Sequence, residues 1–238
     1  MTANASDDPA YDVKISSGGA LNVEMGKASN GKYDYSSDNG FTGVFVNSNV
    51  NFIANAPVNI VVPQGDAIRA NADATINLNS DGNYLKASNR AISSYGNVSV
   101  NGKTTIECAS EAGQCRALTI GTGNIKKPVK LVNIPDNTFE TVKLINVDLN
   151  APIESSSGYG KVVLGDVFKK VTLGENGAIL GVSKLHLSEP LEVRAGARLK
   201  LGDGVCRKAG SSGSVSGELT MRPLASAIGV HPFTEECR

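Results

Sequence analysis

The sequence has 238 residues, with 23 Lys and Arg against 23 Asp and Glu, so its formal net charge at pH 7 is zero. This balance argues against a nucleic-acid-binding protein, which usually carries a surplus of basic residues that displace counterions from phosphates. No apolar run reaches about 18 residues, so no segment is expected to span a membrane as a helix. Asn is unusually abundant, and 21 of the 22 Asn residues lie within residues 1–150.

Residues 1–10 are polar and acidic, and they lack the basic and apolar regions of a secretory signal. This fits either a cytoplasmic protein or a chain from which a signal or a larger upstream part was removed. The four cysteines favour the second interpretation, because disulfides occur mainly in oxidising compartments. Of the three possible pairings we prefer Cys108–Cys115 with Cys206–Cys237, and four reduced thiols are the alternative. Their spacing does not favour a metal site.

Short runs that alternate apolar and polar residues follow one another along the chain, separated by Gly, Asn and Pro. No stretch of 12 or more residues has the apolar spacing of an amphipathic helix, so the pattern predicts strands. In chain order the clearest runs are residues 50–53, 58–62, 74–79, 97–101, 104–108 and 129–134.

A small residue followed by an aliphatic one recurs at intervals of 24, 24 and 26, as Gly43-Val44, Ala67-Ile68, Ala91-Ile92 and Ala117-Leu118. Further inward positions are expected at Val50/Phe52, Ala74/Ile76 and Val98/Val100, and then at Val58/Ile60, Ile106/Cys108 and Val132/Ile134. The second repeat departs from the last pattern with Gly82/Tyr84. A repeat of this length with three strands predicts an all-β fold, a right-handed parallel β-helix (β-solenoid) of about eight turns.

The physics of a solenoid explains the composition. Equivalent residues of successive turns stack about 4.8 Å apart, with Val, Ile and Leu inside and Asn, Ser, Thr and Lys outside. Asn and Gly at corners supply left-handed backbone positions, and stacked Asn side chains form amide ladders. The main rival is a β-sandwich, since Asn101-Gly102 between two alternating runs is typical of a hairpin turn.

After Asn150 the rhythm continues with leucine-rich strands and tighter Gly–acid turns, as in residues 161–166 and 198–203. We therefore expect an N-terminal extension and cap over residues 1–40 and the β-helix over residues 41–205. Residues 206–238 are expected to form a C-terminal cap that protects the exposed strand edges.

The phrases 65–70, 89–106 and 115–121 resemble a repeat of right-handed β-helix, carbohydrate-binding-type domains in bacterial surface proteins. The later Gly-Ala-x-Leu phrases are similar to the passenger β-helices of secreted adhesins. Both resemblances imply an extracellular, largely non-catalytic protein. In some carbohydrate-binding members, acidic polysaccharides bind with calcium at the corners, which is what the resemblance implies for a cofactor here.

Sugar binding usually stacks an aromatic ring on a pyranose ring, and Tyr33, Tyr35, Tyr84 and Tyr95 are the candidate rings. Tyr84 and Tyr95 lie near corners of neighbouring repeats and could share a surface. The alternative is that each tyrosine covers the core at a corner and keeps its hydroxyl in water.

Calcium prefers several converging oxygen ligands, and the corner with Asp81 and Asn83, together with Asp66 one strand away, is the candidate site. An ordinary Asx turn is the alternative interpretation of this corner. Apart from this calcium, no cofactor is expected.

Catalysis is not the favoured interpretation, because no two acids lie at i and i+2 on one predicted strand and neither histidine has a triad partner nearby. The leading hypothesis is a secreted or cell-surface, non-catalytic binding module, an adhesin or polysaccharide-binding domain. Its expected partner is a polysaccharide or a host-surface glycan, with neither nucleic acid nor a membrane span. The alternatives are a structural stalk without a ligand and a polysaccharide lyase or hydrolase.

Overall fold

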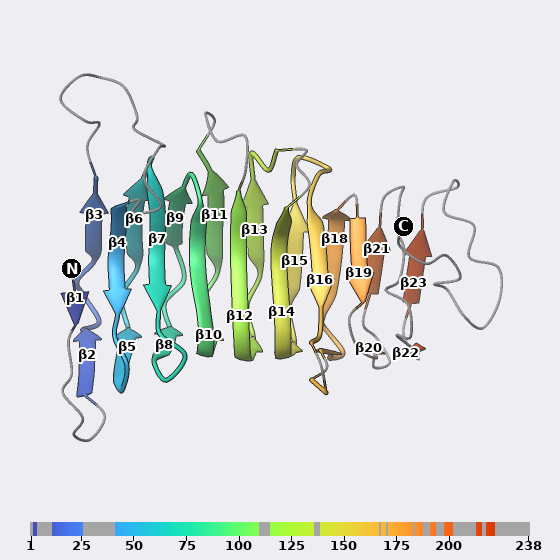
Figure 1. Cartoon of the computed structure of the whole chain (residues 1–238), viewed down its shortest axis with the longest axis horizontal. Coiled ribbons are helices and arrows are strands. Elements are labelled where there is room, and N and C mark those ends of the chain that lie inside the picture. Colours follow the sequence, from blue (N-terminus) through green and yellow to red (C-terminus); the bar gives the residue numbers. More distant parts are fainter. Residues whose placement is uncertain are drawn as a thin grey trace.

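The structure is a computed structural model that describes residues 2–3, 11–25, 41–109, 115–135, 139–166, 168–169, 171–182, 184–187, 191–193, 198–201, 213–215 and 218–221. Within these residues all regular elements are strands, and all ladders between them are parallel. The strands stack side by side in rows along the long axis of the molecule (Figure 1). The predicted all-β solenoid is therefore confirmed, and a β-sandwich built from hairpins is excluded for this part of the chain.

Each turn contributes strands to three rows, which we call the first, second and third faces. The first face contains β1 (Thr2–Ala3), β4 (Phe41–Val46), β7 (Gly65–Ala70), the N-terminal halves of β10 (Arg90–Val100), β12 (Arg116–Ile125) and β14 (Glu140–Leu149), then β16 (Lys161–Leu164) and β19 (Lys184–Leu187). The second face contains β2 (Tyr11–Ile15), β5 (Val50–Ala54), β8 (Thr75–Leu78), the C-terminal halves of β10, β12 and β14, then β17 (Thr172–Leu173), β20 (Leu191–Val193) and β22 (Gly213–Val215).

The third face is a separate sheet of nine strands. Its members are β3 (Leu21–Glu24), β6 (Val58–Val62), β9 (Asn83–Ala87), β11 (Thr104–Cys108), β13 (Val129–Val132), β15 (Pro152–Ser155), β18 (Ala178–Val182), β21 (Arg198–Leu201) and β23 (Glu218–Met221). Because this row contains nine strands, the number of turns differs slightly from the eight expected. Strands β1–β3, within the expected N-terminal cap, and β22–β23, within the expected C-terminal cap, extend the same rows.

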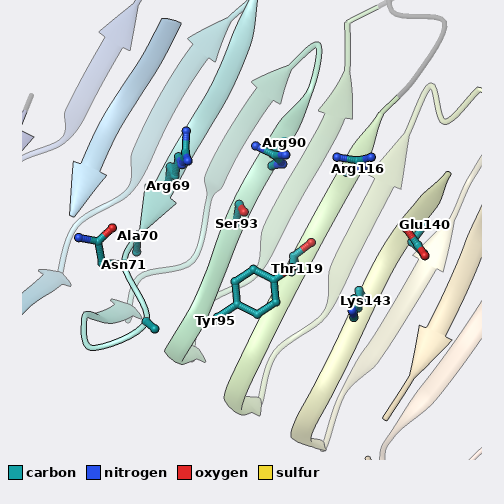
Figure 2. A pocket seen from close by; sticks show the side chains of 11 residues that line it. Arg69, Ala70, Asn71, Arg90, Ser93, Tyr95, Arg116, Thr119, Glu140 and Lys143 are labelled. Atoms are coloured by element: carbon teal, nitrogen blue, oxygen red, sulfur yellow. The ribbon is translucent and has the colours of Figure 1, made fainter. Parts of the chain in front are cut away.

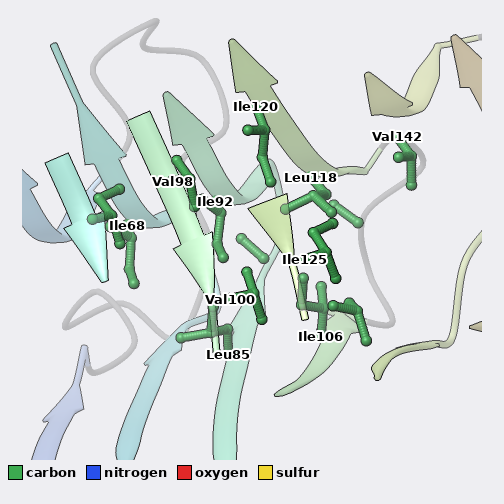
Figure 3. Close-up of a cluster of buried hydrophobic side chains, with 14 of the residues drawn as sticks. Ile68, Leu85, Ile92, Val98, Val100, Ile106, Leu118, Ile120, Ile125 and Val142 are labelled. Carbon is green, nitrogen blue, oxygen red and sulfur yellow. The ribbon is translucent and has the colours of Figure 1, made fainter. Parts of the chain in front are cut away.

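The predicted stacking on the first face is confirmed. Val44 pairs with Ile68, and Ile68 in turn pairs with Ile92. Ile92 then pairs with Leu118, and all four side chains are buried. Aliphatic side chains from the three faces fill the interior between them (Figure 3). Burial of these apolar side chains is the main stabilising contribution to such a fold.

The expected register on the second face is wrong from the third turn onward. Phe52 pairs with Ile76 as predicted, but Ile76 then pairs with Val98, where Val100 was expected. The cause is the length of the corner between the first and second faces. Residues 71–74 connect β7 to β8, whereas only Tyr95 and Gly96 connect the equivalent positions of β10.

Variable corners also shift the expected inward residues on the third face. The observed stack there is Ile60, Leu85, Ile106 and Leu131. Leu85 is the inward residue of the second repeat, which departs from the expected pattern with Gly82/Tyr84, and Leu131 lies inside where Val132 was expected. Asn101 and Gly102 form a corner between β10 and β11 and not a hairpin turn. The Asn101 backbone N–H donates to the Leu78 carbonyl of the preceding turn.

Asn side chains form the predicted amide ladders between turns. Asn101 Nδ2 donates to Asn79 Oδ1 at 2.8 Å, and Asn79 Nδ2 donates to Asn55 Oδ1 at 2.8 Å. A second ladder joins Asn71 Nδ2 to Asn47 Oδ1 at 2.7 Å. Asn49, with φ 59°, also adopts the left-handed conformation expected for Asn at corners. The abundance of Asn in residues 1–150 therefore has a structural explanation.

Within the described residues, no helix is long and apolar enough to cross a membrane.

We predict that Ile106→Ala lowers the free energy of unfolding by about 2–5 kcal/mol, because it leaves a cavity between Leu85 and Leu131. Thr105→Ala, on the outward side of the same strand, is the matched control and is expected to change stability by less than about 0.5 kcal/mol. Urea denaturation followed by circular dichroism measures both. Equal losses for the two variants would contradict the assignment of inward and outward positions.

We also predict that Asn79→Ala lowers the free energy of unfolding by about 1–2 kcal/mol, because Asn79 makes one ladder hydrogen bond to each neighbouring turn. Asn97→Ala is the control, since Asn97 is exposed and its side chain makes no hydrogen bond within the described residues. The same denaturation experiment compares the two. If Asn97→Ala is as destabilising as Asn79→Ala, the ladders do not stabilise the solenoid.

Candidate functional site

The corner between the first and second faces becomes shorter from turn to turn, and this leaves a hollow on the outer surface of the first face. Between the first and second faces, four residues form the corner at 71–74, two form it at 95–96, and Gly121 alone connects Ile120 to Thr122. The backbones of two successive turns approach each other closely at this corner. A side chain at Gly121 would collide with the carbonyl oxygen of Tyr95 in the preceding turn. The wider corner at 71–74 therefore stands as a wall beside the narrower turns that follow.

The resulting groove has a volume of about 460 Å³ and extends over four neighbouring strands, β7, β10, β12 and β14. Figure 2 shows the lining side chains on the outer side of these strands. We call it the basic groove, and it is lined by Arg69, Ala70, Asn71, Ala72, Arg90, Ser93, Tyr95, Arg116, Thr119, Glu140 and Lys143.

Positive charge dominates the basic groove. The lining contains four cations and one carboxylate, Glu140, which gives it a formal net charge of +3 in a chain whose total is zero. Within the described residues, Arg69, Arg116 and Lys143 form no salt bridge. The groove therefore presents cationic groups that the fold does not neutralise.

Arg90 is held from one side by Asp66. Its Nη1 lies 3.4 Å from Asp66 Oδ2, and Asn89 Nδ2 donates to Asp66 Oδ1 at 2.9 Å. Burial raises the pKa of Asp66, and the attraction of Arg90 and Arg69 opposes this rise only in part. Asp66 is 5% exposed and both of its carboxylate oxygens contact neighbouring side chains, so it holds Arg90 in place.

Arg116 is held differently, by an aromatic ring. Its guanidinium carbon lies 5.0 Å from the centre of the Phe139 ring. This cation–π contact fixes one flat side of the guanidinium and leaves its N–H groups available to a planar anion.

Uncharged groups able to bind sugar hydroxyls lie among the cations. Ser93 and Thr119 occupy equivalent positions on β10 and β12, and neither hydroxyl has a hydrogen bond within the described residues. Tyr95 is 59% exposed at the end of the same groove. Its ring is therefore available for stacking, unlike an aromatic side chain that covers the core.

The other predicted tyrosines are placed differently. Tyr84 lies on β9 of the third face, so it does not share a surface with Tyr95 on β10. Its hydroxyl donates to Glu107 Oε2 at 2.6 Å. Burial, and then this hydrogen bond, raise the pKa of Tyr84 to about 12. Tyr33 and Tyr35 lie outside the described residues.

Glu107 is the centre of this second cluster. It accepts hydrogen bonds from Tyr84 and Asn133 and pairs with Lys86 Nζ at 2.9 Å. Burial by itself would raise the pKa of Glu107, but these contacts outweigh it and lower the pKa. The cluster satisfies its own polar groups, which indicates a structural role on the third face.

The three residues considered for calcium are used in protein hydrogen bonds. Asn83 is buried, its Oδ1 accepts from the Val58 N–H, and its Nδ2 donates to the Ser80 carbonyl. Asp81 Oδ1 accepts from the Lys103 N–H at 2.8 Å. Asp66 lies on a different sheet and is not brought together with them. No group of three or more His, Cys, Asp or Glu that could hold a metal occurs in the described residues. Calcium binding stays a prediction.

Cys108 and Cys115 form a disulfide with an S–S distance of 2.02 Å, which links the end of β11 to the start of β12. Both cysteines are buried. Cys206 and Cys237 lie outside the described residues, so their pairing stays a prediction.

Sequence reasoning missed the arginines and the lysine of the basic groove. The signal was present, because Arg69, Ser93, Thr119 and Lys143 each follow an aliphatic core residue directly, and Arg90 and Arg116 each precede it by two positions. Reading the outward residues at constant phase would have aligned these charges.

No protein-family model matches the sequence, and neither a curated protein nor a solved structure shows significant similarity to the chain.

We predict that Glu107→Gln lowers the free energy of unfolding at pH 7 by about 1–3 kcal/mol, because it weakens charge-assisted hydrogen bonds. The folded pKa lies below the ordinary value of 4.5. Ionised Glu107 therefore stabilises the native state above pH 4.5, and this contribution is lost as the pH falls through the folded pKa.

The difference between wild type and Glu107→Gln should consequently be largest at neutral pH and shrink in acid. Denaturation at a series of pH values measures it, with the exposed Glu154→Gln as the control. A difference that is constant over the whole pH range would contradict this role of Glu107.

Proposed function

We propose that this chain is a non-catalytic polysaccharide-binding module of a secreted or cell-surface protein, and that glycan binds in the basic groove. The observation that carries the proposal is the groove itself. It combines an exposed aromatic ring, Tyr95, with the hydroxyls of Ser93 and Thr119, which line the groove and make no hydrogen bond within the described residues. Stacking on an aromatic ring together with hydrogen bonds from polar side chains suits a sugar ligand.

The shape of the groove supports a polymer ligand. Its lining spans four adjacent strands, which is about 14 Å along the solenoid at about 4.8 Å per strand. Ligand residues lying along this direction would meet equivalent protein positions in successive turns. The proposed mode of binding is therefore an extended glycan segment lying across the strands.

The disulfide supports the proposed location. Cys108–Cys115 closes a short loop in a chain whose remaining cysteines are also even in number. Disulfides of this kind persist in oxidising, extracellular environments.

A structural stalk is the second candidate, and the Asn ladders favour it. Side chains that bond to the turns above and below, such as Asn55, Asn79 and Asn101, are used for stability and not for a ligand. A stalk, however, does not need the unneutralised cations of the groove. For a hydrolase, the lining contains one carboxylate, Glu140, whereas glycoside hydrolysis commonly uses two.

We predict that a glycan array probed with the wild-type chain, with and without calcium, shows specific binding that Tyr95→Ala weakens. Tyr159→Ala is the matched control, because Tyr159 is also exposed, at 46%, but lies outside the groove. Loss of the stacking ring is expected to weaken binding by about tenfold, which corresponds to about 1.4 kcal/mol of binding free energy.

The alternatives give different results in the same experiment. An array without any specific signal would support the stalk and contradict glycan binding. Release of unsaturated or reducing sugars from a bound polymer would indicate a lyase or hydrolase. Equal losses for Tyr95→Ala and Tyr159→Ala would show that the glycan does not bind in the basic groove.

A further inference from the structure

We propose that the ligand of the basic groove is an acidic polysaccharide, and that Arg90 and Arg116 together bind one carboxylate or sulfate group of it. This inference rests on the proposed function and names its substrate class. It also assigns Asp66 and Phe139 as positioning residues that act on the ligand only through these two arginines.

The register brings the two arginines together. Arg90 on β10 and Arg116 on β12 are direct partners in a parallel ladder, so their Cα atoms are one strand spacing apart, about 4.8 Å. Figure 2 shows the two side chains at the same level of neighbouring strands. Like charges that are stacked in this way repel each other and destabilise a sheet. An anion that bridges both guanidinium groups would remove this repulsion.

Only one of the two arginines has a carboxylate as a salt-bridge partner within the described residues, although Glu140 also lines the groove. In the same row of the ladder, Asp66 pairs with Arg90 on one side. On the other side Arg116 stacks on Phe139 and forms no salt bridge within the described residues. One arginine is therefore fixed by a carboxylate and the other by a ring. Both guanidinium groups line the groove, and one of them lacks a negative partner.

The remaining cations extend the positive surface along the groove. Arg69 and Lys143 lie in a parallel row, on either side of Ser93 and Thr119. This row therefore reads as a cation, two hydroxyls and a cation over four successive strands. Such an alternation matches a sugar polymer in which acidic groups recur between hydroxyl-bearing rings.

Other polyanions fit less well. A nucleic acid also carries regular negative charge, but its affinity depends mainly on many phosphate contacts and is typical of basic proteins. This chain has no net charge, and its groove has one exposed aromatic ring among hydroxyls. The chemistry therefore favours an acidic glycan, and binding of nucleic acid is one of the outcomes that the test distinguishes.

Isothermal titration calorimetry with chemically matched polymers tests the inference. The probes are dextran, carboxymethyl dextran, dextran sulfate and single-stranded DNA, together with natural neutral, uronic-acid-containing and sulfated glycans from the array. We expect binding of acidic glycans that weakens with rising salt, and no binding of their neutral counterparts. Carboxylated and sulfated probes distinguish the two sources of negative charge.

Arginine variants locate the site. Arg90→Gln and Arg116→Gln are each expected to weaken binding by about tenfold or more, because each removes charge-assisted hydrogen bonds to the anion. Lys130→Gln is the matched control, since it removes the same charge from an exposed position on the third face. If all three variants weaken binding equally, binding depends on the total charge of the protein and not on the Arg90–Arg116 pair, and the assignment of the pair is overturned.

The sign of the Asp66 effect tests its positioning role. Asp66→Asn removes a negative charge near the groove, so long-range electrostatics alone would strengthen the binding of an anion. If Asp66 acts by holding Arg90, the same change weakens binding in a protein whose melting temperature shows that it is folded. Arg90→Lys, which keeps the charge, should restore only part of the affinity lost in Arg90→Gln. Stronger binding by Asp66→Asn would overturn the positioning role.

The outcomes separate the inference from the proposed function. Binding of neutral glycans alone, with the Tyr95 dependence intact, would overturn the acidic class and leave the glycan-binding module standing. If no glycan binds, both the acidic ligand class and the proposed glycan-binding function are overturned. Single-stranded DNA that binds more tightly than any acidic glycan, with the same arginine dependence, would show that the groove recognises a nucleic acid.

Discussion

Parallel, in-register stacking of one turn on the next is the constraint on which the rest of this structure depends. Because strands in a ladder repeat at about 4.8 Å, residues at equivalent positions form continuous rows along the molecule. Inward rows such as Val44, Ile68 and Ile92 form the core. Outward rows of Asn form amide ladders. The same geometry brings residues that are distant in sequence, such as Arg90 and Arg116, into direct contact range without any dedicated loop.

The corners give this regular framework its individual features. Core packing restricts the lengths of the strands, but corners lie at the surface and tolerate insertions and deletions. The corner between the first and second faces contracts from four residues at 71–74 to Gly121 alone. That contraction leaves the earlier turn projecting, and the basic groove lies beside it. A change in corner length thus alters the shape of the surface while the rows of core residues continue.

The fold was largely predictable, and the site was not. The recurrence of Ala67-Ile68 and Ala91-Ile92 at a fixed interval determines the register of the first face, because burial imposes the same requirement on every turn. Beyond Tyr95 the register changed, because no burial pattern marks where a corner loses residues.

The candidate tyrosines are separated for a related reason. Tyr84 is part of a local pattern like that of Tyr95, yet the two lie on different sheets. The hydrogen bond from its hydroxyl to Glu107 indicates a structural role for Tyr84. The charges of the groove are spread over the sequence from Arg69 to Lys143, so no local motif contains them.

The central claim is that an acidic glycan binds on the outer side of the first face, and NMR chemical-shift mapping tests it most directly. An acidic oligosaccharide selected from the array would be titrated into the isotope-labelled chain. We expect the perturbed amides to cluster on β7, β10, β12 and β14, with the largest shifts around Tyr95 and the Arg90–Arg116 pair. Perturbations concentrated on the third face around Tyr84, or spread evenly over the surface, would contradict the account.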